Sequence, residues 1–275
     1  MKKISIVLLL LTSLLTVTGC GIVNKEYNNS VNNKVVNVEE FTIGDFQDAL
    51  VNAIDIAEGS CVSIVDTRYL KSSLGSAVIV KRVNYNGTTI VDDPLNATQY
   101  KYYAVTNNHV IAGLSFNISV YLDENLMEDG YKISSVEVVD YSTAEDLALI
   151  SFTSPVLKEP CKLKDSTKLR KGEIVLAIGS PYSLEFFNTT TMGIISHPNR
   201  FVEENGRKSN YIQHDAAVNP GNSGGGLFDI NGYLIGINTA RIEDDGDYII
   251  GLSLAVPTND LINTFGEEYF DYIIK

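Results

Sequence analysis

A single serine, Ser223, lies in a glycine-rich segment, with Gly221 two residues before it and glycines at 224–226 after it. Glycine at this density disfavours both helix and long strand, so the backbone is expected to form a tight turn. Such a turn can point several backbone N–H groups at one place, where they would stabilise an anionic oxygen. A serine hydroxyl at the same place is a candidate nucleophile. An ordinary Gly/Ser loop is the alternative unless the chain also supplies a base and a group that orients the base.

Three histidines are candidates for that base, and His109 is the best placed. It follows an apolar strand that ends in polar residues, and a strand end followed by a fixed turn holds an imidazole in one orientation. His197 precedes a proline in an expected loop, and His214 lies nine residues before Ser223. Isolated histidines are more often structural, which is the interpretation for His197, and the role of His214 stays open.

The candidate for the orienting carboxylate is Asp146, which opens the apolar run Asp-Leu-Ala-Leu-Ile. A carboxylate at the mouth of a buried strand can stay shielded from water while it accepts a histidine N–H. Its neighbour Glu145 would point the other way, towards solvent, because side chains alternate along a strand. Asp215 is closer to the serine in sequence, but that turn would have to fold back on itself to serve.

The elements that must position these groups are mostly short strands. Residues 44–59 and 259–274 carry apolar side chains at helical spacing and predict an opening and a closing helix. The segments between them are β-branched and separated by turn signals, which favours β-barrels or a sandwich over an α/β sheet. The expected strands are 61–65, 76–83, 102–106, 118–122, 135–139, 147–152, 174–178, 190–195, 211–212, 226–229, 233–238 and 249–255.

Composition narrows the class of partner. The chain has 275 residues and a formal net charge of −13. Phosphate binding needs a basic surface, so this charge argues against nucleic acid as a partner. The three cysteines, at 20, 61 and 161, are too few and too scattered for a disulfide framework or a zinc site. No metal or cofactor is expected, and the sequence leaves open whether Cys61 and Cys161 pair.

The first twenty residues have the layout of an export signal, with two lysines, an apolar run and a small-residue ending at Cys20. The ending Val-Thr-Gly-Cys resembles a bacterial lipoprotein signal, which implies that Cys20 is lipidated and becomes the first mature residue. The expected organisation is a signal at 1–19, a flexible tether at 20–43 and a folded domain at 44–275. The mature chain is strongly acidic, so the lipid itself would anchor it on the extracytoplasmic face of the cell membrane.

Several stretches together resemble the HtrA/DegP branch of the chymotrypsin-like (trypsin-like) serine proteases. They are Tyr-Ala-Val-Thr-Asn-Asn-His-Val-Ile around His109, Asp-Leu-Ala-Leu-Ile from Asp146, Leu-Arg-Lys-Gly-Glu-Ile-Val-Leu-Ala-Ile-Gly-Ser-Pro, and the glycine segment of Ser223 continuing to Asn-Gly-Tyr-Leu-Ile-Gly-Ile-Asn-Thr-Ala. They occur in the family's order between residues of about 45 and 260, and agreement among several motifs is more specific than any one of them.

The resemblance implies an all-β, chymotrypsin-like fold of two six-stranded β-barrels, with a short N-terminal helix, a C-terminal helix and the site in the cleft between the barrels. It implies that Ser223 is the nucleophile, that His109 is the general base and then the acid, and that Asp146 orients His109. Backbone N–H groups of Gly221 and Ser223 would form the oxyanion hole. The strand containing Asn238 resembles the one that pairs with an extended substrate. Substrates would be unfolded or extended extracytoplasmic proteins.

Two features depart from the family's usual pattern. HtrA proteins commonly carry a PDZ domain of about 90 residues after the protease domain, and only the closing helix is expected after residue 257. In the family, threonine is common at the position of His214.

The pocket for P1, the residue whose carbonyl is attacked, is expected near Ala217 and Val218 and would favour small aliphatic side chains. Arg241 at its rim would add tolerance for acidic P1 residues, unless it points to solvent or pairs with nearby acids.

Two alternatives stay open. One is a glutamyl-endopeptidase-like protease on the same fold, and the other is a surface-binding lipoprotein that keeps the fold without turnover. The sequence does not fix the oligomeric state.

Overall fold

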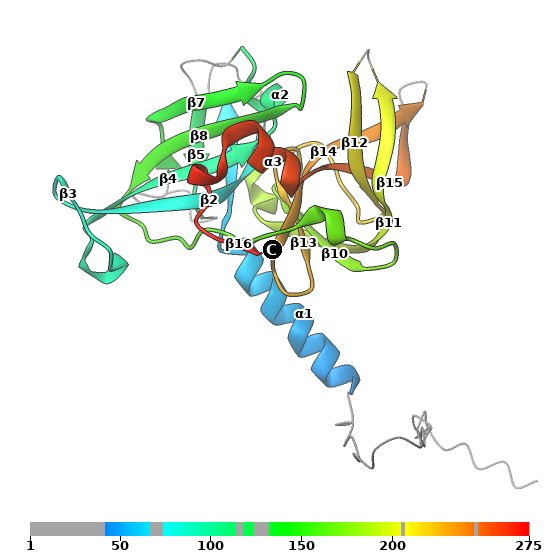
Figure 1. Ribbon diagram of the computed structural model, residues 1–275, viewed down its shortest axis with the longest axis horizontal. Coiled ribbons are helices and arrows are strands. Elements are labelled where there is room, and N and C mark those ends of the chain that lie inside the picture. Colours follow the sequence, from blue (N-terminus) through cyan, green and yellow to red (C-terminus); the bar gives the residue numbers. More distant parts are fainter. Residues whose placement is uncertain are drawn as a thin grey trace, which may run out of the picture. The chain divides into compact units, whose positions relative to one another are not determined.

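Two curled, mainly antiparallel sheets, joined by a shared core, make up most of the computed structural model (Figure 1). The structure describes residues 42–66, 74–113, 118–123, 132–204, 207–244 and 247–274. Residues 41–275 form one compact unit. Among the described residues, no helix has both the length and the apolar character needed to cross a membrane.

The first sheet has the strand order β6-β5-β1-β2-β4-β8-β7, and β3 pairs with β2. The sheet contains six longer strands and two short strands of two residues each. The bounds are β1 (Cys61–Asp66), β2 (Leu74–Asn86), β3 (Thr89–Ile90), β4 (Gln99–Thr106), β5 (Ile118–Tyr121), β6 (Lys132–Ile133), β7 (Val136–Ser142) and β8 (Leu147–Ser154).

The second sheet has the order β13-β10-β11-β12-β15-β14-β9-β16, and β13 also pairs with β14. It too has six longer strands and two short ones, so the predicted pair of six-stranded units is confirmed. The bounds are β9 (Leu163–Lys164), β10 (Ile174–Gly179), β11 (Thr189–Glu204), β12 (Arg207–His214), β13 (Gly226–Asp229), β14 (Leu234–Asp244), β15 (Asp247–Pro257) and β16 (Ile273–Ile274).

Three apolar clusters form the core. One fills the first sheet and a second fills the other sheet, as expected for curled sheets whose inner faces are apolar. The third contains side chains of both sheets together with helices α1 (Ile43–Glu58) and α3 (Thr258–Phe265). This third cluster fixes one sheet against the other, so loops from the two sheets can build a common site.

The opening helix α1 forms where predicted. Thr42 caps it, because its hydroxyl accepts from the N–H of Asp45 at 3.1 Å while the Asp45 carboxylate accepts from the N–H of Thr42 at 2.7 Å. Ala53 and Ala57 are buried against the core, whereas Ile43 is 87% exposed. Only the C-terminal part of the helix therefore packs on the sheets.

The closing helix is shorter than predicted, and the prediction of a helix over residues 259–274 is wrong in its extent. Helix α3 ends at Phe265 because Gly266 takes a φ of +89°, which is outside the right-handed helical region. A 3₁₀ turn (η4, Glu267–Tyr269) follows, and β16 then pairs in parallel with β9. The apolar residues after Gly266 still pack on the core, although they are not in a helix.

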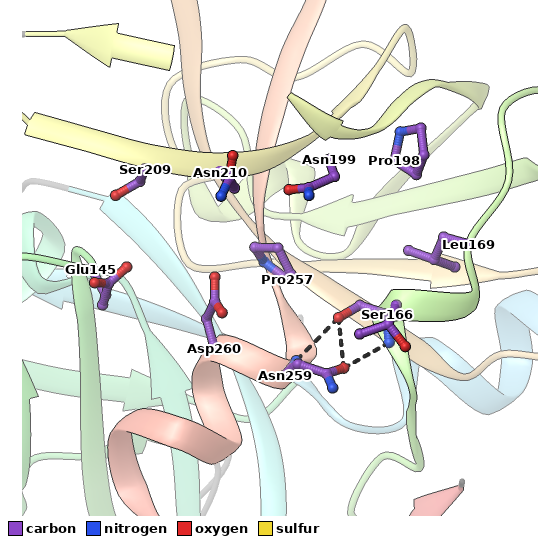
Figure 2. Close-up of a pocket in the computed structure, with 11 residues that line it drawn as sticks. Glu145, Ser166, Leu169, Pro198, Asn199, Ser209, Asn210, Pro257, Asn259 and Asp260 are labelled. Carbon is purple, nitrogen blue, oxygen red and sulfur yellow. Dashed lines mark hydrogen bonds between the residues drawn. The ribbon is translucent and has the colours of Figure 1, made fainter. Parts of the chain in front are cut away.

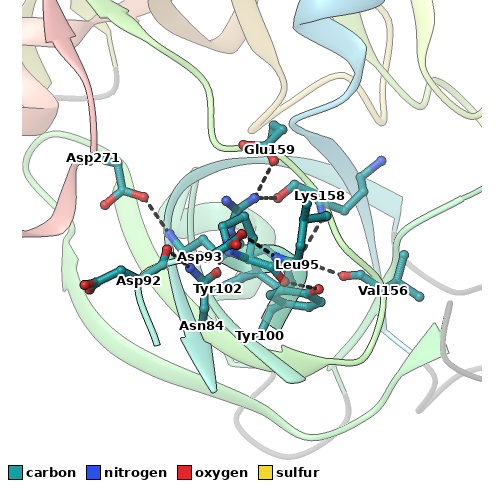
Figure 3. Close-up of polar contacts among 12 residues, drawn as sticks. Asn84, Asp92, Asp93, Leu95, Tyr100, Tyr102, Val156, Lys158, Glu159 and Asp271 are labelled. Atoms are coloured by element: carbon teal, nitrogen blue, oxygen red, sulfur yellow. Dashed lines mark hydrogen bonds and ion pairs between the residues drawn. The ribbon is translucent and has the colours of Figure 1, made fainter. Parts of the chain in front are cut away.

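A polar cluster around Arg82 holds the C-terminal segment on the first sheet (Figure 3). The Arg82 backbone N–H donates to Asp271 at 2.9 Å, and its guanidinium donates to Glu159 at 2.7 Å. Tyr102 donates to the carbonyl of Val156 at 2.7 Å. These hydrogen bonds stabilise the fold, and none of them involves the candidate site.

Four strands of the second sheet are longer than the sequence indicated. Strands β11 and β12, and likewise β14 and β15, continue beyond their buried ends as hairpins whose side chains are largely polar. Pairing between the two strands of a hairpin satisfies the backbone there without an apolar face, so alternation of apolar residues does not mark these extensions.

Cys61 and Cys161 are both buried, and both are free thiols. Burial raises the pKa of the Cys61 thiol to about 12, so the reactive thiolate is strongly disfavoured. The question that the sequence left open is answered in favour of two unbridged cysteines.

Candidate active site

His109 and Asp146, the predicted base and orienter, lie side by side. His109 is in the short helix α2 (Asn108–Ile111), which directly follows β4. Its Nδ1 is 2.8 Å from Oδ2 of Asp146, and its backbone N–H donates to Oδ1 at 3.0 Å. A carboxylate can only accept, so Nδ1 carries the proton and Nε2 is left as the basic nitrogen.

The backbone around Asp146 is shaped to present this carboxylate. Its φ of 55° is left-handed, a conformation that aspartate tolerates better than most residues. The Asp146 carbonyl accepts from the side-chain amide of Asn107 at 2.9 Å and from the backbone N–H of Asn108 at 3.1 Å. Strand β8 begins at the next residue, so Asp146 lies at the mouth of a buried strand as the sequence indicated.

The pKa of Asp146 reflects two opposing effects. Burial favours the neutral acid and raises the pKa, but hydrogen bonds from His109 and Thr239, together with the electrostatic attraction of His109, outweigh it and leave the pKa below its ordinary value. The Thr239 hydroxyl donates to Oδ2 at 2.8 Å. Asp146 is therefore held as an anion in a nearly dry position, with 4% of its surface exposed.

Ser223 lies on a turn whose next position, Gly224, can be occupied only by glycine. Gly224 has a φ of +84°, and a Cβ there would lie 2.1 Å from the Ser76 carbonyl oxygen. The Ser76 N–H donates to the Ser223 carbonyl at 2.8 Å, so β2 of the first sheet holds the turn of the second. The glycines are thus required by close backbone contacts, which excludes a flexible Gly/Ser loop.

The hydroxyl of Ser223 donates to the backbone carbonyl of Thr239 over 3.3 Å. No hydrogen bond joins Ser223 to His109 within the described ranges. Catalytic hydrogen bonds are often long or unformed in the absence of substrate. Thr239 contacts both Ser223 and Asp146, through its carbonyl and its hydroxyl, and so links the two halves of the site.

Two backbone N–H groups of the turn have no acceptor in the described part of the chain, those of Gly221 and Ser223. The N–H of Asn222 between them donates to the Asn219 carbonyl at 2.9 Å, and the N–H of Gly224 donates to Asn238 at 2.8 Å. Gly221 has a φ of +101°, which a side chain would not adopt readily. These are the two donors that the resemblance assigns to an oxyanion hole, and that role stays a prediction.

The four residues expected near P1 fall in different places. Ala217 is exposed and its carbonyl accepts from Thr191 at 2.7 Å, whereas Val218 is 6% exposed and packs in the core of the second sheet. Asn238 is completely buried, and its Nδ2 donates to the Gly226 carbonyl at 2.8 Å. Arg241 pairs with β15 through its backbone, but its side chain is outside the described residues.

The sequence did not single out Thr239 or Ser76 as part of the site. Both are polar residues within apolar strands, and both are buried. A buried polar residue at a strand position needs a hydrogen-bond partner, and this is the signal that could have marked Thr239 and Ser76.

Cys20, the expected lipidation residue, lies outside the described residues.

The other acids near the site serve elsewhere. Asp215 accepts from the N–H of Ile194 at 2.6 Å. Glu145 lines a cavity of about 520 Å³ and faces Asp260 across it (Figure 2). Burial first, and then the charge of Glu145, raises the pKa of Asp260. Glu145 thus lines this cavity, and Asp146 is the carboxylate that is hydrogen-bonded to His109. No cluster that could hold a metal ion occurs in the described part of the chain.

His214 has no contact with the His109–Asp146 pair among the described hydrogen bonds, but it affects stability. It is completely buried, and burial lowers its pKa from 6.5 to about 4. Below pH 6.5 the His214 imidazole is protonated in the unfolded chain but stays neutral in the folded chain. The free energy of unfolding therefore falls as the pH drops towards 4. The loss is about 1.4 kcal/mol per pH unit, or about 3 kcal/mol in all.

We therefore expect His214→Leu to lose less stability than the natural chain on going from pH 7.5 to pH 5, by about 2 kcal/mol. Urea unfolding at the two pH values measures this. The partly exposed His197, whose Nδ1 accepts from the N–H of Asn199 at 3.2 Å, gives the control His197→Leu. Equal pH dependence in the natural chain and His214→Leu would contradict the prediction.

Two β-barrel sheets, with a His–Asp pair on one and a serine turn with free N–H groups on the other, define the chymotrypsin-like class of serine peptidases. The chain belongs to the trypsin-like peptidase family, whose domain it matches over residues 86–237, and within that family it is similar to HtrA proteases.

Relatives among the HtrA proteases are similar over most of the chain. The serine protease Do-like HtrA of Lactococcus lactis subsp. lactis is 37% identical over 241 residues, which cover 85% of this chain and 53% of that protein. The periplasmic serine endoprotease DegP of Salmonella typhimurium is 43% identical over 163 residues, covering 59% of this chain and 32% of that protein. This chain spans about half the length of the first of these relatives and a third of the second.

A solved structure gives the same assignment of fold. The HtrA-type protease AlgW, determined with a tripeptide, is 33% identical and superposes with a TM-score of 0.61 over 80% of this chain and 64% of that one. The predicted all-β, double-barrel fold is therefore confirmed.

Proposed function

We propose that this protein is a serine endopeptidase in which Ser223 attacks a peptide carbonyl. His109 takes the Ser223 proton through Nε2 and returns it to the leaving amine, while Asp146 holds the imidazole and stabilises its charged form. The N–H groups of Gly221 and Ser223 bind the oxyanion that forms. The Ser223 hydroxyl reaches His109 by rotating about its Cα–Cβ bond, away from the Thr239 carbonyl.

The observation that carries this proposal is the fixed His109–Asp146 pair, held by hydrogen bonds of 2.8 and 3.0 Å and tied to the serine turn through Thr239. A purely structural histidine has no need of a buried carboxylate whose residue is held at its backbone carbonyl by two further amides, those of Asn107 and Asn108. The test is labelling with a fluorophosphonate, which reacts with activated serines only. We expect the label on Ser223, in proportion to turnover of unfolded casein.

The two alternatives give different results in this test. A surface-binding lipoprotein without turnover would take up no label and cleave no casein. A glutamyl-endopeptidase-like enzyme would take up the label but cut only after acidic residues. The 37% identity to a serine protease, in an alignment that covers 85% of this chain, supports the endopeptidase.

The proposed substrates are unfolded or extended extracytoplasmic proteins. AlgW carries a tripeptide, and strand β14 beside Ser223 offers a backbone edge on which an extended chain could pair. Small aliphatic P1 residues are proposed from Ala217 and Val218, with a minority of acidic ones that depends on Arg241. Peptides with an acidic P1 residue test the latter, and their complete resistance to cleavage would remove Arg241 from substrate choice.

We further propose a lipid anchor at Cys20 on the extracytoplasmic face of the membrane. Relatives in Haemophilus influenzae and Salmonella typhimurium are named as periplasmic proteases, which supports an extracytoplasmic location. Globomycin, which blocks cleavage of lipoprotein signals, is expected to make a heavier precursor accumulate. Cys20→Ser is expected to abolish incorporation of labelled palmitate, and unchanged processing in both experiments would contradict the anchor.

A further inference from the structure

An exposed tyrosine, Tyr182, has a strained backbone conformation beside the serine turn. Its φ is 69°, in the left-handed region that bulky residues rarely adopt. Its side chain is 86% exposed. Residues with such strain persist only where surrounding contacts hold them, and they cluster at active sites and ligand-binding sites. A ring that is exposed to water adds little packing to the fold, so stability does not explain why a tyrosine stands here.

The serine turn itself holds the backbone of Tyr182. The Tyr182 N–H donates to the Pro220 carbonyl at 2.8 Å. A Cβ at Gly221 would lie 2.4 Å from the Ser180 carbonyl oxygen and 2.9 Å from the Tyr182 nitrogen, so the two segments are in direct backbone contact. Gly221 also carries one of the two N–H groups proposed to bind the oxyanion. Tyr182 therefore lies directly beside the proposed reaction centre.

Ser180, two residues before Tyr182, ties the same segment to the first sheet. Its N–H donates to the hydroxyl of Ser76 at 2.9 Å, and that hydroxyl donates to the Gly221 carbonyl at 2.8 Å. The Ser180 hydroxyl is also hydrogen-bonded to the hydroxyl of Ser63. The segment and the serine turn thus share their anchors on β1 and β2, and the left-handed conformation of Tyr182 is fixed by these contacts.

The strand order places Tyr182 on one side of the serine turn and β14 on the other. Strand β13 begins just after the turn, and it pairs with β14 along one edge and with β10 along the other. Beyond the start of β13, β14 continues to Thr239, which accepts the Ser223 hydroxyl, whereas β10 continues into the segment that contains Tyr182. An extended peptide that pairs with β14 and crosses the turn therefore leaves over Tyr182.

We infer that the ring of Tyr182 binds the side chain of one of the two residues that follow the cleaved bond, P1′ or P2′, and favours an apolar or aromatic side chain there. The inference rests on the proposed endopeptidase function and names part of its specificity. Side chains of an extended peptide alternate between two faces, so only one of the two positions can reach the ring. An exposed ring gains by covering its apolar surface, and an aromatic partner adds the energy of ring stacking.

The test uses peptides that are identical up to P1 and carry Phe or Ser at P1′ or at P2′. For the natural chain we expect kcat/KM to be about 3- to 10-fold higher with Phe at one of these positions, as for one aromatic contact. Tyr182→Asn is expected to remove this difference, because asparagine tolerates a left-handed φ but lacks the ring. Tyr182→Phe is expected to retain it. The matched control is Tyr272→Asn, at a tyrosine near the C-terminus that is 47% exposed, and it should also retain the difference.

A methyl ester of the same acyl segment separates contact with the substrate from an effect on the turn. The ester has no residue after P1, so its hydrolysis needs the nucleophile and the oxyanion donors but not the Tyr182 ring. We expect the natural chain and Tyr182→Asn to hydrolyse it at nearly equal rates. Equal losses of ester and peptide hydrolysis in the variant would mean that Tyr182 only positions the turn, which would overturn the inference.

Two other results would overturn it as well. One is equal cleavage of the Phe and Ser peptides at both positions by the natural chain, a result that does not depend on the folding of any variant. The other is a difference that persists in Tyr182→Asn. If that variant also shows a smaller mass than the natural chain in sedimentation, a second copy of the chain covers the ring instead of the substrate.

Fluorophosphonate labelling separates failure of this inference from failure of the proposed function. Natural protein that takes up the label but does not distinguish the peptides refutes only the role of Tyr182. A folded protein without label or turnover refutes the endopeptidase and the inference together.

Discussion

Ser223→Ala is expected to lower the rate of casein and peptide cleavage by about 10⁴-fold or more, because nucleophile, base and orienter act as a unit. Without the hydroxyl no acyl-enzyme forms, and His109 has no proton to accept from the protein. The free N–H groups at 221 and 223 do not depend on the serine side chain, so a small residual rate above that in water would remain.

The folded state should survive this substitution. The Ser223 hydroxyl makes one long hydrogen bond of 3.3 Å, and the turn is held by backbone contacts such as that from Ser76. Circular dichroism and urea unfolding should therefore match those of the natural chain. Ser209→Ala, on the polar cavity, is the matched control and should keep full activity and labelling. A folded Ser223→Ala variant with natural turnover would exclude Ser223 as the nucleophile.

The residues that could be named from sequence are those whose chemistry is unusual for their local context. Ser223 stands among glycines, His109 follows a strand that ends in polar residues, and Asp146 opens an apolar strand. The structure adds the reason for the glycines, since a Cβ at Gly224 would meet the backbone of β2, which is distant in sequence. Such a contact depends on how the two sheets pack and has no local signature.

The partners that were missed are set by the same long-range packing. Thr239 lies beside Asp146 only because β14 of the second sheet meets the loop before β8 of the first. The C-terminal residues Ile273 and Ile274 kept a helical spacing in the sequence, yet they form a strand because Gly266 turns the chain and β9 offers a free edge. Local propensity was overridden there by a partner far away in sequence.

Asp146→Asn is expected to reduce kcat by about 10⁴-fold while leaving the fold intact. The left-handed φ of 55° at this position is tolerated by asparagine as well as by aspartate. The carboxylate, however, accepts from His109 at both oxygens and also from Thr239. An amide has one accepting oxygen, so its NH₂ group would face a donor unless the imidazole changes its tautomer.

That change of tautomer is the physical reason for the expected loss. If the amide NH₂ donates to Nδ1 of His109, the proton moves to Nε2, and Nε2 can then no longer accept the proton of Ser223. Fluorophosphonate labelling should slow in parallel with peptide cleavage, since both need an activated serine. Glu145→Gln is the matched control, because this neighbouring carboxylate lines the cavity shared with Asp260 and should keep nearly natural turnover. If Glu145→Gln impaired cleavage as strongly as Asp146→Asn, the loss would reflect the removal of negative charge near the site, and the orienting role of Asp146 would be refuted.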